Sequence, residues 1–216
     1  RIKFVLEFIK KENAMLKRTK LLSLLTSLLF SATAMAEAGN MMVRMRAINI
    51  MPQEDGTTSA NGDVRLQSES VPEIDFTYFL TDSVAFELIA ATATHSAGVY
   101  NSAAGNVDLG EVSLLPPTLL VQYHHDFGDF KPYVGVGINY TFFYGEYSGN
   151  SSSILGTDYE NSFGWAAQVG ADYKIGEKVY LNVDVKRIAL STDVTVRSTI
   201  SGAETITSDL DINPVV

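Results

Sequence analysis

The most regular pattern of apolar and polar positions in this chain runs from Lys131 to Gly145. Apolar residues occupy every second position, and small or polar residues fill the gaps: Val134, Val136, Ile138, Tyr140 and Phe142 alternate with Gly135, Gly137, Asn139 and Thr141. A period of two residues is typical of a β-strand with one apolar face. The alternation lasts about ten residues, enough for a tilted strand to cross a ~30 Å hydrocarbon layer, whereas soluble strands are usually about half as long. The pattern therefore predicts a wall strand that faces lipid.

Similar alternating runs follow one another along most of the chain. They predict strands near residues 41–51, 64–80, 83–95, 111–126, 130–146, 161–175 and 178–196, with the start of another at 207–216. The connections alternate between tight turns at 81–82, 127–129 and 176–177 and longer segments at 52–63, 96–110, 147–160 and 197–206. Short periplasmic turns and long outer loops are typical of outer-membrane barrels. A soluble lipocalin-like barrel is the alternative, but its exterior would be polar. We therefore expect an all-β, antiparallel, transmembrane β-barrel over residues 37–216.

Alternation also sorts side chains into a lumen set and a lipid set, and the lumen set changes with depth. Its charged members lie near the short turns: Arg44, Arg46, Glu87, Asp172 and Lys174. Its apolar members lie nearer the long loops: Ile48, Ile50, Ile89, Leu120, Phe143, Ile188 and Leu190. We expect an apolar funnel, open to the outside, above a charged plug in which arginines pair with carboxylates, because buried unpaired charge is costly. A purely structural role, holding the barrel together, also explains the plug.

Prolines interrupt two of the expected strands. Pro116 and Pro117 lie in the fourth strand and Pro72 in the second. Because proline donates no hydrogen bond to a strand ladder, the wall is weaker at these positions. We infer a possible lateral exit, through which an apolar solute leaves the lumen for the bilayer. A local bend without any role in transport is the alternative.

The beginning of the chain reads as an export signal. Residues 15–36 have a basic start, a short apolar run from Leu21 to Phe30 and a small-residue cleavage site that ends at Ala36, as in a secretory signal peptide. Residues 1–14 read as an upstream, non-native extension. Residues 1–36 hold seven of the 16 Lys and Arg but two of the 25 Asp and Glu, so the remainder has a formal charge of −14, which argues against a nucleic-acid partner. The chain has no cysteine, and no apolar run after residue 36 is long enough for a transmembrane helix.

Several short segments carry a resemblance to a known family. They are Phe79-Leu80-Thr81-Asp82, Leu115-Pro116-Pro117-Thr118-Leu119, Lys131-Pro132-Tyr133-Val134-Gly135, Asn161-Ser162-Phe163-Gly164 and Leu210-Asp211-Ile212-Asn213-Pro214. Through them the chain resembles the outer membrane protein W (OmpW) family over most of residues 40–216. The resemblance implies an eight-stranded barrel in a Gram-negative outer membrane, with a narrow and largely apolar lumen for small hydrophobic molecules. Relatives assist alkane uptake. Phe163 holds an aromatic position of the family motif and is expected to narrow the lumen, although alternation turns it outward with Trp165.

The chain departs from the family pattern at its end. The family continues through a last strand that ends in an aromatic residue, part of the signal for the barrel-assembly machinery, whereas this sequence stops at Val216. We therefore expect a truncated C-terminus and an eighth strand that is barely begun.

Residues for catalysis or metal binding form no recognisable set. His124 and His125 are adjacent and point to opposite faces of a strand, and His95 is the only other histidine. No nucleophile with a matching base and no phosphate-binding loop is present, so we expect neither an enzyme nor a cofactor or metal. The leading hypothesis is a passive outer-membrane channel for small hydrophobic solutes. The alternative is a structural or receptor-type barrel without transport. The sequence indicates no oligomeric state.

Overall fold

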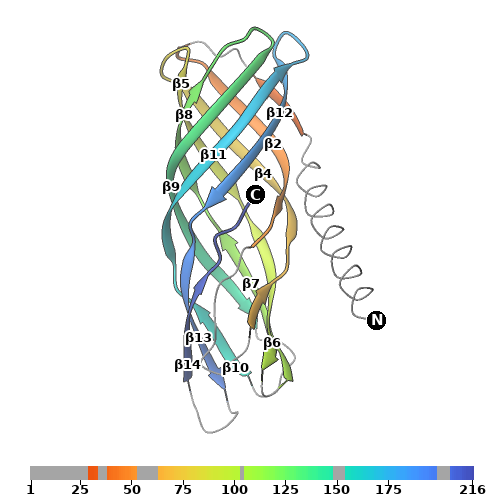
Figure 1. The fold of residues 1–216 in the computed structure, drawn as a ribbon, viewed down its shortest axis with the longest axis vertical. Coiled ribbons are helices and arrows are strands. Elements are labelled where there is room, and N and C mark those ends of the chain that lie inside the picture. Colours follow the sequence, from red (N-terminus) through yellow and green to blue (C-terminus); the bar gives the residue numbers. More distant parts are fainter. Residues whose placement is uncertain (1–28, 34–37, 53–62, 103–104, 148–153, 199–204) are drawn as a thin grey trace, which may run out of the picture.

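A ring of eight strands dominates the molecule. The computed structural model describes residues 29–33, 38–52, 63–102, 105–147, 154–198 and 205–216. Neighbouring strands of the ring pair antiparallel (Figure 1), in the order β1 (Leu29–Thr33), β2 (Met41–Ile50), β4 (Glu69–Phe79), β5 (Val84–Ala91), β8 (Thr118–His124), β9 (Phe130–Tyr147), β11 (Ser162–Lys174) and β12 (Val179–Ile188). The ring closes where β12 pairs with β1. Among the described residues, no helix is long and apolar enough to cross a membrane.

Toward the long loops the wall continues through further strands. β3 (Asp63–Leu66), β6 (Ala93–Ser102) and β7 (Gly105–Leu115) pair in series, and β7 also pairs with the distal part of β9. β10 (Ile154–Tyr159), β13 (Ser191–Ser198) and β14 (Thr205–Asp211) form a separate three-stranded sheet. The expected loops at 96–110, 147–160 and 197–206 are therefore partly wrong, because strand residues extend into each of them. Backbone pairing and a few buried apolar side chains, such as Leu109, Val194 and Leu210, hold these strands, whose apolar alternation is shorter than that of the wall.

The segment 207–216 differs from its expected form. Its first half, 207–211, belongs to β14, which forms a hairpin with β13 rather than a wall strand. After β14 the chain bends at Asn213, which has a φ of 37°. Val215 then bridges Met51 beside β2 and Arg187 of β12. Only these last residues lie between β2 and β12 on the long-loop side.

On the short-turn side, β1 fills the space between β2 and β12. Ala32 pairs with Val43 of β2 and with Val179 of β12. This segment belongs to the expected signal peptide, yet it completes the ring here because two facing strand edges present backbone groups that any extended segment can satisfy. Residues 1–28 and 34–37, which hold the expected extension and the rest of the leader, lie outside the described residues.

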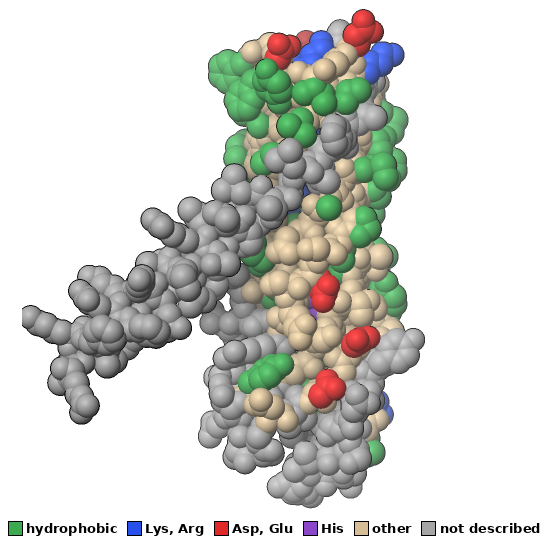
Figure 2. Space-filling view, turned by 90° about the vertical axis from the view of Figure 1, so that its right-hand side faces the viewer, with side chains coloured by type: hydrophobic (Ala, Val, Ile, Leu, Met, Phe, Trp, Pro, Cys, Tyr) green, Lys and Arg blue, Asp and Glu red, His purple; other side chains and the backbone are tan. Residues whose placement is uncertain are grey.

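Burial alternates along the wall strands, as the period of the sequence predicts. In β8 the buried side chains are Thr118, Leu120, Gln122 and His124, and the exposed ones are Leu119, Val121 and Tyr123. Figure 2 shows hydrophobic side chains gathered on the half of the barrel nearer the short turns, with charged side chains at its rim. On β9 the exposed apolar row extends from Phe130 to Phe142. At ~3.4 Å per residue and a tilt of about 40°, this row is about 30 Å tall, which matches a hydrocarbon layer.

Candidate functional site

Arg44 of β2 lies at the centre of a polar network that crosses the lumen. Its guanidinium is 3.1 Å from the Asp75 carboxylate, 3.3 Å from that of Glu87 and 2.9 Å from that of Asp172. It also donates a 2.7 Å hydrogen bond to the Thr77 hydroxyl. These partners come from β4, β5 and β11, so a single side chain links strands on different sides of the ring. Arginine suits this position because its planar guanidinium offers five donors.

Arg46 extends the network toward the long loops. Its guanidinium lies 3.0 Å from the Glu73 carboxylate and 3.0 Å from that of Glu87. It also pairs with Asp75 and Asp184. Arg44 and Arg46 stand two residues apart on β2, so both point into the lumen and share carboxylates from the same neighbouring strands.

Lys186 of β12 is the third cation of this network. Its Nζ atom lies 2.9 Å from Glu73 and 3.1 Å from Asp184. The expectation that Lys174 belongs to the plug is wrong. Lys174 is only half-buried at the short-turn end, and its side chain forms no ion pair with any described residue. It stands at the last position of β11.

We name the eight buried charged residues of this network the plug: Arg44, Arg46, Glu73, Asp75, Glu87, Asp172, Asp184 and Lys186. All are at most 9% exposed, and they hold three formal positive and five formal negative charges. Burying such ions costs several kcal/mol each, and only well-placed partners offset that cost. The plug therefore fixes one arrangement of the wall strands and fills the lumen in the short-turn half.

A tyrosine packs among the ions of the plug. Tyr133 donates a 3.2 Å hydrogen bond to Asp184 and accepts one of 3.0 Å from Asn182. The Arg44 guanidinium lies 5.3 Å from the centre of the Tyr133 ring, within the range of a cation–π contact. A Cβ atom at Gly170 would lie 2.5 Å from this ring, so glycine on β11 makes room for it.

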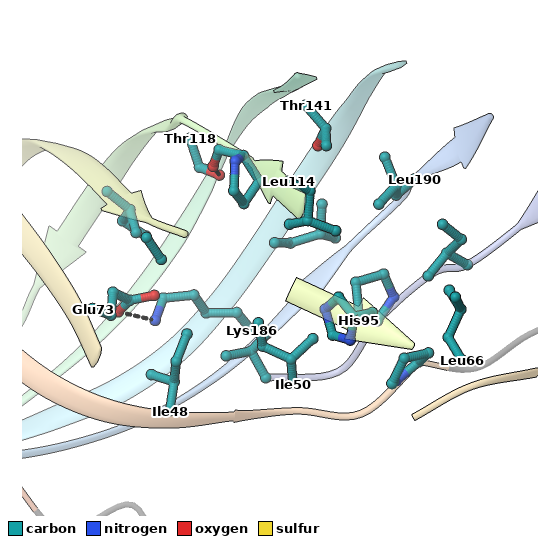
Figure 3. A pocket seen from close by; sticks show the side chains of 18 residues that line it. Ile48, Ile50, Leu66, Glu73, His95, Leu114, Thr118, Thr141, Lys186 and Leu190 are labelled. Atoms are coloured by element: carbon teal, nitrogen blue, oxygen red, sulfur yellow. Dashed lines mark hydrogen bonds and ion pairs between the residues drawn. The ribbon is translucent and has the colours of Figure 1, made fainter. Parts of the chain in front are cut away.

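Toward the long loops, the plug gives way to an apolar chamber (Figure 3). It holds about 660 Å³ of space not filled by atoms, its mouth included. Most of the lining is aliphatic, and the Glu73–Lys186 pair of the plug forms its floor. The lumen therefore changes from ionic to apolar within one barrel.

The structure brings most of the expected lumen residues together. Five of them line the chamber: Ile48, Ile50, Ile89, Ile188 and Leu190. Leu120 is buried in a cluster with Ile89 and Ile188, beside the chamber. Phe143 packs against the same cluster and stacks on Tyr159, with 5.6 Å between ring centres.

The expectation that Phe163 narrows the lumen is wrong. Its side chain is 67% exposed on the outer face, beside Trp165 at 55%. The preceding residue, Ser162, is buried and takes the inward place. Since neighbouring positions of a strand point to opposite faces, Phe163 must face lipid.

The wall beside the chamber loses its regular ladder at Pro116–Pro117. The β5–β8 ladder ends at the pair Ile89 and Thr118, and the next ladder, between β6 and β7, begins only at Ala93 and Leu114. Neither proline has an N–H to donate across this interval. We name this interval the proline break. Pro116 lines the chamber, so the break borders it directly.

Pro72 lies on the other side of the same interval. The β4–β5 ladder ends at the pair Glu73 and Ala91, one residue after Pro72. Pro72 itself is exposed on the outer face and keeps its place opposite Ala47 in the β2–β4 ladder. The three prolines therefore converge on one patch of wall, although they come from strands far apart in the sequence.

Polar side chains bind the backbone at the proline break. The Asn139 amide donates hydrogen bonds of 3.2 Å and 3.4 Å to the carbonyls of Pro116 and Pro117, and one of 2.8 Å to the Thr118 hydroxyl. Thr141 in turn donates to Asn139 at 2.8 Å. These side chains add hydrogen bonds to the backbone of the break, where the Pro117 carbonyl also accepts a 3.1 Å hydrogen bond from the Tyr140 N–H.

Comparisons with known proteins fit this geometry. A sequence model described as the OmpW family matches residues 37–216. The chain belongs to the OmpW family. Outer membrane protein W of Vibrio cholerae is 32% identical over 191 residues, 83% of this chain and 86% of the relative. An uncharacterized outer-membrane protein of Sinorhizobium fredii, y4mB, is 39% identical over 154 residues, 70% of this chain and 66% of the relative.

A solved structure supports the same assignment. The crystal structure of the outer membrane protein OprG from Pseudomonas aeruginosa superimposes with a TM-score of 0.78 at 25% identity, covering 84% of this chain and 94% of OprG. The prediction of an eight-stranded antiparallel barrel is confirmed. As an OmpW-family member, the protein is an outer-membrane β-barrel of Gram-negative bacteria.

No motif in the sequence marks His95 as a functional residue. In the described part of the chain, no three His, Cys, Asp or Glu side chains are grouped to hold a metal ion. The structure instead buries His95 in the chamber wall, where it is 2% exposed. Alternation in the sequence indicates that His95 points inward. It does not indicate what orients the ring, because the partner, the Gln67 carbonyl, lies in the connection between β3 and β4.

Proposed function

We propose that this OmpW-family barrel passes small hydrophobic molecules across the outer membrane by passive diffusion. A solute enters from the outside, occupies the apolar chamber and leaves sideways through the proline break into the bilayer. The observation that carries this proposal is the chamber itself, which is apolar, closed below by the Glu73–Lys186 pair and bordered at its side by Pro116.

Energetics favour the sideways route over a straight one. A solute that crosses the plug must separate buried ion pairs, and breaking one such pair costs about 3–5 kcal/mol. At the proline break, the ladder already lacks donors at Pro116 and Pro117, so parting β5 from β8 costs fewer hydrogen bonds. The exit leads into the lipid around the wall, where an apolar solute is stable.

The other partners follow from the barrel. The lipid-facing rows of Val, Ile, Phe and Tyr contact the hydrocarbon layer, and the barrel-assembly machinery is the proposed route of insertion. A structural or receptor-type barrel remains the rival function. It has no need for an apolar chamber in an interior that side chains of eight strands nearly fill.

Uptake into intact cells tests the proposal. Cells of a Gram-negative host without an OmpW-family protein of its own are compared with and without this chain, using radiolabelled octane and a sugar of similar mass. We expect faster octane uptake with the protein and unchanged sugar uptake. Equal octane uptake in both cell types would overturn the proposal and leave the structural function. A rise in sugar uptake would show a water-filled pore and would overturn the sealed plug.

A further inference from the structure

One ring nitrogen of His95 lies unpartnered in the apolar chamber. The His95 side chain extends from β6 and is 2% exposed. Its Nδ1 atom is 2.9 Å from the backbone carbonyl of Gln67, which follows β3. Its other ring nitrogen, Nε2, has no hydrogen-bond partner among the described residues. A ring nitrogen without a partner on a residue that lines the chamber offers a hydrogen-bonding place for a ligand or a water molecule.

The hydrogen bond between Nδ1 of His95 and Gln67 determines what the other ring nitrogen, Nε2, can bind. A carbonyl oxygen only accepts hydrogen bonds, so Nδ1 of His95 must carry the proton and donate it. In the neutral imidazole, Nε2 is then a lone-pair acceptor. The chamber wall therefore presents an acceptor to any molecule inside, and its complement is a donor such as a hydroxyl group.

The position of His95 suits a ligand that is otherwise apolar. Figure 3 shows the His95 ring on one side of Ile50 and the Glu73–Lys186 pair on the other, with the aliphatic lining around them. Along the strands, His95 lies four residues beyond Ala91, the register partner of Glu73. That separation is about 13 Å along the strand, room for an aliphatic tail between the two polar ends.

The charge beneath the chamber argues against an anionic ligand. The plug holds five carboxylates and three cations, a formal charge of −2 among the described buried residues. The Lys186 ammonium at the floor is already paired with Glu73 and Asp184. A fatty carboxylate would bring a further negative charge into this low-dielectric interior, whereas a neutral alcohol would not.

We propose that His95 makes the chamber selective for neutral aliphatic molecules with one terminal hydroxyl group, such as medium-chain primary alcohols. The hydroxyl donates to Nε2 of His95, and the tail lies against the aliphatic lining. This inference rests on the proposed function, because the solute must occupy the chamber. His95 is a specificity-determining residue and not a catalytic one.

Competition against octane uptake tests the proposal, with the full-length chain in intact cells. The competitors are 1-octanol and its isomer 1-methoxyheptane, which has the same atoms but no hydroxyl donor. We expect 1-octanol to halve octane uptake at a concentration about fivefold lower than the concentration of the ether that does so. A fivefold difference corresponds to the free energy of one neutral hydrogen bond. Octanoate is expected to compete less well than 1-octanol.

Variants separate the role of His95 from a merely structural one. His95→Phe keeps an aromatic ring but removes the acceptor, so the fivefold advantage of the alcohol is expected to vanish while octane uptake persists. His95→Gln keeps an amide donor for the Gln67 carbonyl and an acceptor, so it is expected to retain part of the advantage. His125→Phe is the matched control, because His125 is exposed at the short-turn end and should leave the advantage unchanged.

The outcomes distinguish this inference from the proposed function. If no variant and no wild-type protein raises octane uptake above that of control cells, the proposed function fails and this inference fails with it. If wild-type uptake is raised but the alcohol and the ether compete equally, only the selectivity is overturned. The same holds if His95→Phe keeps the full advantage at equal barrel levels.

Discussion

The two halves of the lumen use the same alternation of strand residues for opposite purposes. In the plug, inward positions are charged and each ion has several partners, as for Arg44 with Asp75, Glu87 and Asp172. In the chamber, inward positions such as Ile50 and Ile188 are aliphatic and leave space unfilled. The difference shows that burial in a small barrel does not by itself define a role. A filled polar section seals and orders the wall, and an unfilled apolar section can receive a solute.

The largest expected effect is on the plug. Arg46→Met leaves the five buried carboxylates of the plug with only two cations, Arg44 and Lys186, so we expect a loss of about 3–5 kcal/mol in the free energy of unfolding. Urea unfolding of the barrel in detergent micelles measures it. Lys174→Met is the control and should change stability by less than about 0.5 kcal/mol, because Lys174 lies outside the network. Equal stability of the two variants would contradict the plug.

A pair of neighbouring leucines tests which face of β8 belongs to the chamber side. Leu120 is 1% exposed and Leu119 is 45% exposed. Leu120→Ala opens a cavity beside the chamber and should cost about 2–5 kcal/mol, whereas Leu119→Ala removes only a lipid-facing group and should cost less than about 1 kcal/mol. The same urea titration compares them. Equal losses would show that the inward and outward faces are assigned wrongly.

Restoring the wall tests the proline break. The double variant Pro116→Val, Pro117→Val supplies two backbone donors, of which that of residue 116 faces the break because the backbone of Pro117 faces β9. That donor is worth about 1 kcal/mol if it joins the ladder. A wall that opens there would then open about fivefold less often, and octane uptake at equal barrel levels should fall accordingly. Pro132→Val is the control, because Pro132 lies in the intact β9–β11 ladder. Unchanged uptake in the double variant would leave the prolines as a bend without a transport role.

The smallest effect is expected at the short-turn rim, outside both halves. Lys131 and the Gly128 N–H bind the Asp126 carboxylate, and the hydrogen bond from Lys131 chiefly lowers the pKa of Asp126 below its usual range. A lowered pKa in the folded state adds stability above about pH 4 that is lost as pH falls further. Because Asp126 is exposed, Asp126→Asn should cost only a few tenths of a kcal/mol at pH 7 and nothing once wild-type Asp126 is protonated. Unfolding curves of both proteins at pH 7 and at a pH where wild-type Asp126 is protonated measure this cost. An equal loss of stability at the two pH values would contradict the ion pair.

Much of this architecture follows from the sequence because a strand has a fixed period. Alternation correctly turns Arg44, Glu87 and Asn139 inward, and the tight turns are correctly located. Phe163 shows the limit of the family motif, since strand period alone turns it outward. Lys174 shows the limit of alternation, which gives the face of a residue but not whether a partner is within reach.

Other features depend on contacts between distant segments. The distal parts of β6, β7 and β13 extend into expected loops, because pairing with neighbouring strands builds them where the apolar alternation of the sequence is short. The role of His95 depends on the carbonyl of Gln67, 28 residues away in the chain. The convergence of Pro72 on the same wall patch as Pro116 depends on strand register, which is set by pairing and not by either segment alone.

The most direct test of the account uses the absence of cysteine from the chain. A single cysteine is introduced either in the chamber, as Ile50→Cys, or beyond the plug at the short-turn end, as Lys174→Cys, and each is labelled with a bulky thiol reagent. Octane uptake is then measured in intact cells at equal barrel levels. We expect labelling of Ile50→Cys to abolish the uptake due to the protein and labelling of Lys174→Cys to leave it unchanged. Uptake that survives the chamber label, or that the Lys174→Cys label blocks, would contradict a route through the chamber and out of the wall.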